Sequence, residues 1–290
     1  MTTSFVSTLE TNHDVDLSFL KDIDDTDIKT NIKDCILNMI SLMDSVTNSD
    51  PSHSHGFIHC LTVWKNGRRA LLFEKDLSET DRLAIELACI LHEVDDRKFF
   101  PNKINKDYPN ARKILREIIL FTHYSDEKQQ VLPADDHLND FIELVIKMIS
   151  LVSCSENGNN SQNVNKRWMF IKRDCDRLEA SGSIGIYRCH RYTVESGKPL
   201  FTNETPRITS KEDLYKVATK ERFQQYQSNK ESVSMIDHFY DKLLHLNEYP
   251  SGNEYLHKLG KERHSVVENF VLQFGKKGEI DINEIELGHC

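Results

Sequence analysis

Three short stretches of the sequence carry side chains that could bind a metal ion and phosphate. The first, residues 54–59, is SHGFIH, in which two histidines stand four residues apart. Such a pair lies on one face of a helix or straddles its first turn. The chain has 13 histidines, so a pair at this spacing also arises by chance. This stretch therefore favours a metal site only in combination with others.

The second stretch, residues 91–98, is LHEVDDRK. An apolar helical stripe stops there at one imidazole, three carboxylates and two cations. One interpretation is a helix C-terminus followed by a solvated charged loop. The other is a pair of metal ligands, His92 and Glu93, followed by groups for acid–base chemistry and phosphate binding.

The third stretch, residues 173–182, is RDCDRLEASG. Two acids near the start of a helix complement the helix dipole. Alternatively, one of them completes a metal site whose other ligands come from the first two stretches.

Taken together, and in this order, the three stretches resemble the HD-domain superfamily. They are most similar to bacterial and fungal HD hydrolases with the patterns SHDxxHxxRV, LLHDxxD and DADRLDAIGAIGIAR, which fall here at 54–59, 91–96 and 174–188. Residues 197–201 resemble that family's GRPIY, residues 238–244 its HFYEKLL and residues 262–264 its ERH. The resemblance extends from about residue 30 to residue 275, with the motifs in the family's order and spacing.

The resemblance implies one divalent metal ion held by His59, His92, Glu93 and Asp176. Two imidazoles and two carboxylates suit Mn²⁺, Fe²⁺, Co²⁺, Ni²⁺ or Mg²⁺, with a preference for the transition metals. Asp174 is the alternative fourth ligand. Asp176 is preferred because it is the acid immediately before Arg-Leu in the family pattern, and Asp174 would then start the helix or support the site from behind.

The resemblance further implies hydrolysis of a phosphomonoester or phosphoanhydride, with a nucleotide as the favoured substrate. Asp96 is the candidate catalytic residue, which would orient or deprotonate a water or protonate the leaving group. His55, Arg97 and Lys98 are expected to hold phosphate oxygens by charge-assisted hydrogen bonds.

One departure from the family pattern affects the activity: the His-Asp dipeptide is His92-Glu93 here. Glutamate keeps an anionic oxygen, but its extra methylene displaces that oxygen unless the backbone or the metal shifts. An error of about 1 Å can cost on the order of 100-fold in rate. A weakened HD domain that binds a nucleotide or metal as a sensor is therefore the alternative function. An HD-fold oxygenase with two irons would need additional ligands, which these motifs do not suggest.

Several other residues have two interpretations. His123 and His190 are expected to be structural or surface residues before they are ligands. Arg188 either reaches the substrate or pairs with an acid. The 238–244 segment is explained nearly as well by a helix that packs against the site.

The elements expected to position these residues are all helices. Apolar residues recur at three- and four-residue steps, and no strand-like alternation appears, which predicts an all-α fold. Ser78 followed by Asp81 resembles a capping box at the start of a helix that continues to Leu91. Further helices are expected over roughly 108–123, 137–153, 166–186, 231–247 and 252–274, and an irregular segment over 190–210. We predict one HD-domain helical bundle with long helices over 28–275, a poorly ordered polar segment over 1–27 and a C-terminal tail over 276–290.

Composition excludes some partners. The formal net charge is −9, without a long run of lysine and arginine, which argues against nucleic acid but leaves room for a small anionic substrate. Seven scattered cysteines without a CxxC pair fit a reducing compartment. No signal-peptide core or membrane-length apolar run is present, so the expected location is cytoplasmic. Helical HD proteins can pair, so a homodimer is a further expectation.

Overall fold

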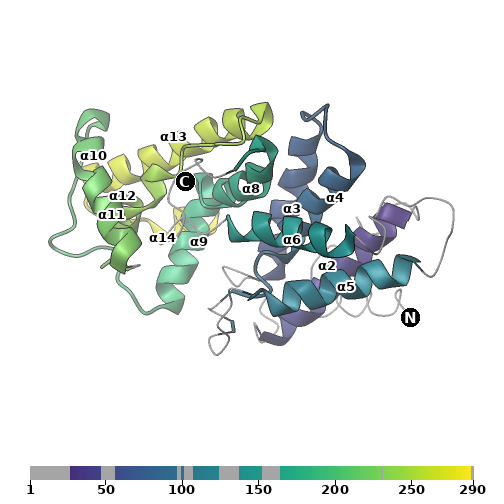
Figure 1. The fold of residues 1–290 in the computed structure, drawn as a ribbon. Helices are drawn as coiled ribbons and strands as arrows, with labels where there is room; N and C mark the ends of the chain where they lie inside the picture. The colour runs from purple at the N-terminus through teal and green to yellow at the C-terminus, as the bar shows by residue number, and fades with distance from the viewer. Residues whose placement is uncertain are drawn as a thin grey trace. The chain divides into compact units, whose positions relative to one another are not determined.

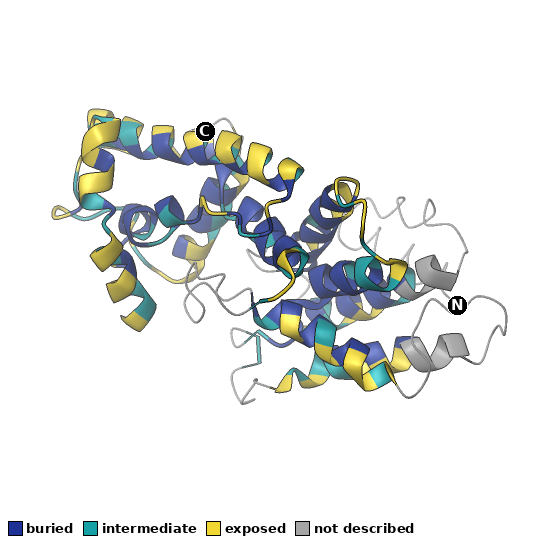
Figure 2. Ribbon diagram, turned by 45° about the horizontal axis from the view of Figure 1, so that its top comes forward, coloured by how far each residue is buried: buried dark blue, intermediate teal, exposed yellow. Residues whose placement is uncertain are grey.

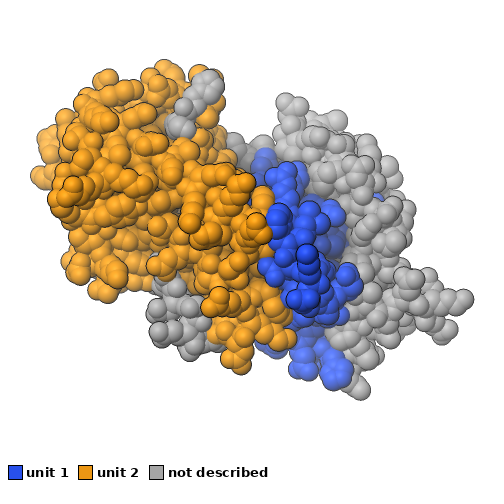
Figure 3. All heavy atoms as spheres, turned by 90° about the horizontal axis from the view of Figure 1, so that it is seen from above, with its two compact units in different colours: residues 1–150 blue, residues 151–290 orange. Residues whose placement is uncertain are grey.

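The computed structural model describes residues 27–46, 56–96, 99–100, 107–123, 137–151, 164–229 and 231–288. Within these ranges the regular elements are helices and no strand occurs, so the predicted all-α class is confirmed. The chain divides into two compact units, residues 1–150 and 151–290, which Figure 3 colours separately. The predicted disorder before residue 27 lies outside the described residues, and the single domain over 28–275 stays a prediction.

The first unit is built around one central helix. Its elements are α2 (Asp27–Val46), α3 (Phe57–Leu71), α4 (Glu79–Leu91), α5 (Pro109–His123) and α6 (Leu138–Ser150), shown in Figure 1. Helix α4 packs against α2, α3 and α6, because it carries an almost continuous run of buried apolar residues from Leu83 to Leu91. The Ser78 hydroxyl accepts a hydrogen bond from the Asp81 amide at 3.1 Å, so the cap predicted at the start of this helix is present.

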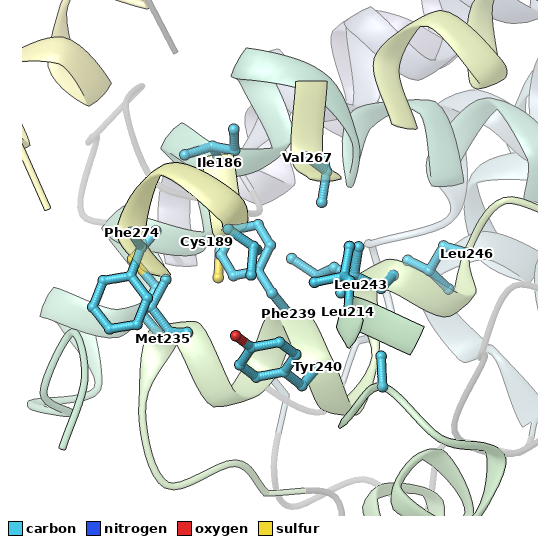
Figure 4. Packing of buried hydrophobic residues seen from close by; sticks show 14 of the residues in the cluster. Ile186, Cys189, Leu214, Met235, Phe239, Tyr240, Leu243, Leu246, Val267 and Phe274 are labelled. Carbon is cyan, nitrogen blue, oxygen red and sulfur yellow. The ribbon is translucent and has the colours of Figure 1, made fainter. Parts of the chain in front are cut away.

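The second unit consists of shorter helices around one long helix. Its elements are η4 (Arg167–Phe170), α8 (Ile171–Glu179), α9 (Gly182–Glu195), α10 (Lys211–Val217), α11 (Lys220–Asn229), α12 (Met235–Asp241), η5 (Leu243–His245), α13 (Glu254–Lys277) and α14 (Ile282–Glu286). Figure 4 shows apolar side chains of α9, α12 and α13 converging in its core, with Phe239 among them. Along α13 the buried residues recur mostly at three- and four-residue steps, as amphipathic spacing requires, and Figure 2 shows this helix exposed along one side and buried along the other.

The structure divides the single helix predicted over 166–186. The chain leaves α8 at Ala180, becomes extended at Ser181 and re-enters a helix at Gly182, whose φ of 69° belongs to the left-handed region. A β-carbon on Gly185 would lie 2.4 Å from the carbonyl carbon of Ala180. The glycines of this motif therefore allow α8 and α9 to meet at a sharp turn.

Other boundaries also differ from the sequence-based expectations. Helix α9 continues to Glu195, so the irregular segment expected from residue 190 begins later. Helices α10 and α11 fill residues 211–229, for which no element was expected. Helix α13 runs to Lys277, beyond the helix end predicted at residue 274. In the described part of the chain, no helix combines the length and the apolar character needed to cross a membrane.

Replacing Gly185 with alanine should destabilise the protein. Helix propensity alone would stabilise the variant by about 1 kcal/mol, but the clash with Ala180 should dominate and cost about 1–3 kcal/mol. Chemical denaturation would measure the free energy of unfolding. The neighbouring exposed residue provides the control, since Ile184→Ala should change that energy by no more than about 0.5 kcal/mol. An increase in stability for Gly185→Ala would contradict the close approach of the two helices.

Candidate metal centre

Two neighbouring helices of the first unit supply the imidazoles. His59 lies in the first turn of α3, where its amide donates to the carbonyl of Gly56 at 3.1 Å. His92 caps the C-terminus of α4. Both side chains are buried, although histidine is usually found at least partly exposed. Two buried imidazoles at the ends of two neighbouring helices indicate a binding site for a metal ion.

The tautomer of His92 follows from its contact with the backbone. Its Nδ1 atom lies 2.9 Å from the carbonyl oxygen of Cys89. A carbonyl can only accept, so Nδ1 carries the proton and Nε2 keeps a lone pair. Metal-binding histidines commonly donate their other ring nitrogen to a carbonyl in this way, because the bond fixes both the ring orientation and the tautomer.

Three potential ligand atoms of the first unit converge. The Nε2 atoms of His59 and His92 lie 3.1 Å apart, and Oε1 of Glu93 lies 3.4 Å from the His92 nitrogen and 3.7 Å from the His59 nitrogen. Ligands about 2.1 Å from a metal are separated by about 3.0 Å at adjacent octahedral positions and by about 3.4 Å in a tetrahedron. The three atoms therefore fit a shared divalent cation.

The glutamate at position 93 still reaches this group of atoms. Its carboxylate is buried, and one oxygen stands within 3.7 Å of both imidazole nitrogens. The extra methylene, which was expected to displace the oxygen, is accommodated within the turn that follows α4. Metal binding by this triad is thus compatible with glutamate.

Of the predicted catalytic and phosphate-binding residues, the structure describes only Asp96. Asp96 is half-buried in the turn after α4, and its amide donates to the carbonyl of Glu93 at 3.0 Å. The assignments of His55, Arg97 and Lys98 fall outside the described residues.

A polar contact inside the first unit holds α3 against α4. The indole nitrogen of Trp64 donates to Oε2 of Glu86 at 2.7 Å, and the Arg68 guanidinium stands over the indole ring, 5.3 Å from its centre. Burial raises the pKa of the Glu86 carboxyl, and the hydrogen bond from Trp64 opposes that shift. This contact sets the spacing between the helices that carry His59 and His92.

The two acids of the third stretch have distinct surroundings in the second unit. Asp174 is fully buried in α8 and accepts a hydrogen bond from the amide of Ser251 at 3.0 Å. Burial raises the pKa of Asp174 to about 6, against the lowering effect of the Ser251 hydrogen bond. Asp174 therefore anchors the turn before α13, where Asn253 caps that helix. Asp176 is half-buried on the same helix.

Other residues of the family-like motifs have structural contacts in the second unit. A guanidinium nitrogen of Arg188 donates to the carbonyl of Glu179 at 3.0 Å, and the Tyr240 hydroxyl donates to the carbonyl of Pro206 at 2.9 Å. His190 is buried in α9, where desolvation lowers its pKa. The side chain of His123 lies outside the described part of the chain.

Sequence inspection missed the contact between Trp64 and Glu86 in the first unit and the role of Ser251 as the partner of Asp174 in the second. Trp64 and Glu86 are 22 residues apart, and Ser251 is 77 residues from its partner Asp174. No local pattern connects positions so distant.

The chain is similar in sequence to a viral protein and in structure to bacterial proteins. No family model matches it. It is 40% identical over 223 residues to protein L803 of Acanthamoeba polyphaga mimivirus, covering 76% of this chain and 88% of the viral protein. A Lactobacillus plantarum protein of known structure is 19% identical, with a TM-score of 0.58 over 86% of this chain and 97% of that one. Bacillus subtilis YpgQ in complex with ADP is 17% identical, with a TM-score of 0.52 over 87% and 97% of the two chains.

The Glu86 carboxyl predicts a pH dependence of stability. The pKa of Glu86 is raised in the folded chain, so folding favours the protonated carboxyl. The stability of the folded state is therefore unaffected by this group below the unfolded pKa of 4.5, and it decreases as the pH rises through the folded pKa. Glu86→Gln removes this titration but keeps an acceptor for Trp64. The free energy of unfolding of the wild type should therefore fall relative to the variant as the pH increases from about 4 to about 7.

Denaturant unfolding at several pH values would test this prediction. Asp76→Asn, which alters an exposed carboxylate in the loop before the same helix, should leave the pH profile parallel to that of the wild type. Parallel profiles for Glu86→Gln and the wild type would contradict the role of burial at this position.

Proposed function

Because this chain belongs to the family that includes mimivirus protein L803, shares the fold of the Lactobacillus plantarum protein and of YpgQ, and has motifs that resemble those of HD hydrolases, we propose that it is a metal-dependent phosphohydrolase. The observation that carries the proposal is the buried group formed by Nε2 of His59, Nε2 of His92 and Oε1 of Glu93, whose separations of 3.1–3.7 Å suit a shared cation. A cation there would offset the cost of bringing these donor atoms together away from water.

We assign the fourth ligand to Asp176. The acid stands directly before Arg177-Leu178, as in the family pattern, and Asp174 already accepts a hydrogen bond from the backbone of Ser251. A set of two imidazoles and two carboxylates favours Mn²⁺, Fe²⁺, Co²⁺ or Ni²⁺, with Mg²⁺ as a further option. When bound, such an ion supplies Lewis acidity, which acidifies water and offsets negative charge on a phosphoryl group.

The reaction that we propose is attack of water on phosphorus. A bond forms between the water oxygen and phosphorus, the bond from phosphorus to the leaving oxygen breaks, and the proton of the water is transferred away. Asp96 is our candidate for the group that orients the water, accepts its proton or returns a proton to the leaving oxygen. It follows Glu93 by three residues, and its amide is bonded to that residue's carbonyl, so its side chain emerges from the same turn.

The proposed substrate is a small phosphorylated molecule, with a nucleotide preferred over a nucleic acid. The structure of YpgQ contains ADP, which supports a nucleotide for a chain of similar fold. With a net charge of −9, the protein as a whole repels phosphate, so attraction must be local. We propose that His55, Arg97 and Lys98 supply it.

The setting that we propose is the cytoplasm, either as a monomer or as a homodimer. The cysteines within the described residues are buried free thiols, which supports a reducing compartment: Cys35, Cys60, Cys89, Cys175 and Cys189.

Phosphate release from a panel of nucleotides in the presence of Mn²⁺ would test the proposed activity. The wild type should turn over at least one nucleotide. Glu93→Gln should reduce the rate by at least roughly 100-fold, because it neutralises one ligand of the buried triad. Glu79→Gln, at an exposed position of the same unit, should leave the rate unchanged. Equal rates for the wild type and Glu93→Gln would contradict the proposed site.

The same assay, combined with calorimetry, separates the hydrolase from the alternative function, a sensor without turnover. Glutamate at position 93, in place of the aspartate of the family pattern, is the feature that favours the sensor. A sensor would bind Mn²⁺ and a nucleotide in calorimetry without releasing phosphate or pyrophosphate. In that case Glu93→Asp, which restores the dipeptide of the family pattern, should switch on hydrolysis. Loss of activity in Glu93→Asp from an active wild type would instead show that this chain is adapted to glutamate.

A pair of matched variants tests the choice between the two acids of α8. Asp176→Asn should weaken Mn²⁺ binding by more than roughly 10-fold, because it removes charge from a ligand. Asp174→Asn should keep Mn²⁺ affinity close to that of the wild type and change the melting temperature, because that side chain holds the Ser251 turn. Isothermal calorimetry with Mn²⁺ measures both affinities. The reverse pattern would make Asp174 the ligand.

A further inference from the structure

Helix α5 begins without a capping side chain of its own. The residue before it, Tyr108, accepts the amide of Arg112 at its carbonyl and therefore occupies the capping position. Its φ of 47° is the only positive value for a non-glycine residue in the described ranges. Side chains that cap helices are short and polar, as in serine, threonine, aspartate and asparagine. The first amides of α5 must therefore find an acceptor elsewhere.

Asp95 provides that acceptor from a distant part of the chain. Its Oδ1 accepts a hydrogen bond from the amide of Asn110 at 3.0 Å, and its Oδ2 accepts one from the amide of Ala111 at 2.9 Å. A third bond runs in the other direction, from the side-chain amide of Asn110 to the carbonyl of Val94 at 2.7 Å. A carboxylate is well placed here, because the N-terminus of a helix carries partial positive charge.

These three bonds fix the turn that carries the metal ligands. Asp95 lies between Glu93 and Asp96 in a stretch closed by short-range backbone bonds, from Val94 to Leu91 at 3.3 Å and from Asp96 to Glu93 at 3.0 Å. Moving such a turn by one ångström would move the side chains on either side of it by a similar amount. Metal sites depend on this kind of support, because a ligand set holds an ion only where its geometry is maintained.

We propose that Asp95 is a positioning residue for the metal centre, and that it acts by clamping the Leu91–Asp96 turn to the start of α5. This inference rests on the proposed function, since it concerns the ligands of that site. The family pattern LLHDxxD leaves position 95 open, so the role follows from the contacts of this chain. Asp95 acts through the turn, and neither binds the metal nor reacts with substrate.

Mn²⁺ calorimetry on the full chain, together with thermal melting, tests the proposal. Asp95→Ala should raise the dissociation constant for Mn²⁺ roughly 10- to 100-fold, the range for residues that support ligands from behind. Asp95→Asn should have a smaller effect, because one acceptor oxygen remains. The visible absorption spectrum of the Co²⁺-loaded protein should also change in Asp95→Ala, because the ligands would be held less firmly.

A matched control separates this role from simple loss of a helix cap. Asp281 caps α14 in the same way, accepting at Oδ1 from the amides of Asn283 and Glu284 at 3.0 and 3.3 Å. Asp281→Ala should leave Mn²⁺ affinity and the Co²⁺ spectrum unchanged. If Asp95→Ala melts at a lower temperature but binds Mn²⁺ as tightly as the wild type, Asp95 is only a cap and the proposal is overturned.

Two further outcomes are informative. If the wild type itself does not bind Mn²⁺, the proposed function fails with the inference, which distinguishes that failure from a failure of the variant alone. If Asp95→Ala does not fold, Asn110→Ala offers a milder test. It keeps Asp95 but removes the bond to Val94, and it should weaken Mn²⁺ binding several-fold. Unchanged affinity in Asn110→Ala would then overturn the proposal.

Discussion

The convergence of two imidazole nitrogens and a carboxylate oxygen in a buried position is the constraint on which the first unit depends. Nitrogen and oxygen donor atoms brought within 3.1–3.7 Å of one another away from water are costly in the absence of a positive charge. Packing must therefore hold them there. The apolar run of α4, buried against three helices, provides a rigid base for His92 and Glu93 at its end.

The polar groups around this centre orient its ligands in different ways, some by direct contact and some through the packing of helices. The carbonyl of Cys89 selects the tautomer of His92. The contact between Trp64 and Glu86 sets the spacing of α3 and α4, at the expense of a carboxyl group whose charged form is disfavoured by burial. Each of these groups contributes geometry and not reactivity, which explains why their residue types alone do not reveal them.

The sequence was sufficient to predict the fold class and to single out the turn after α4. Apolar residues at three- and four-residue steps predicted helices, and the apolar stripe ends abruptly at His92, whose Nε2 atom lies close to that of His59. The helix cap at Ser78 was also predictable from the sequence, because a capping box is a local pattern. Ligand identity depended on the resemblance to HD hydrolases, since His59 and His92 are separated by 33 residues and no periodicity links them.

What the sequence did not reveal depends on contacts between distant residues. The break between α8 and α9 follows from the approach of Gly185 to Ala180, which the continuous apolar spacing conceals. Helices α10 and α11 were overlooked because few of their residues are buried, so their apolar stripe is weak. The effect of glutamate at position 93 also depends on a long-range contact, because its longer side chain ends beside the imidazole nitrogen of His59.

The bond between Asp174 and Ser251 has a consequence for the way the protein is made. The two residues are 77 positions apart, so the Asp174 carboxylate of α8 gains its donor, the Ser251 amide, only after most of the second unit has left the ribosome. Until then, a helix with a fully buried aspartate, lysine and arginine in the native state must remain hydrated. The second unit should consequently assemble late in synthesis and as a whole, in contrast to a chain whose helices are completed by local contacts.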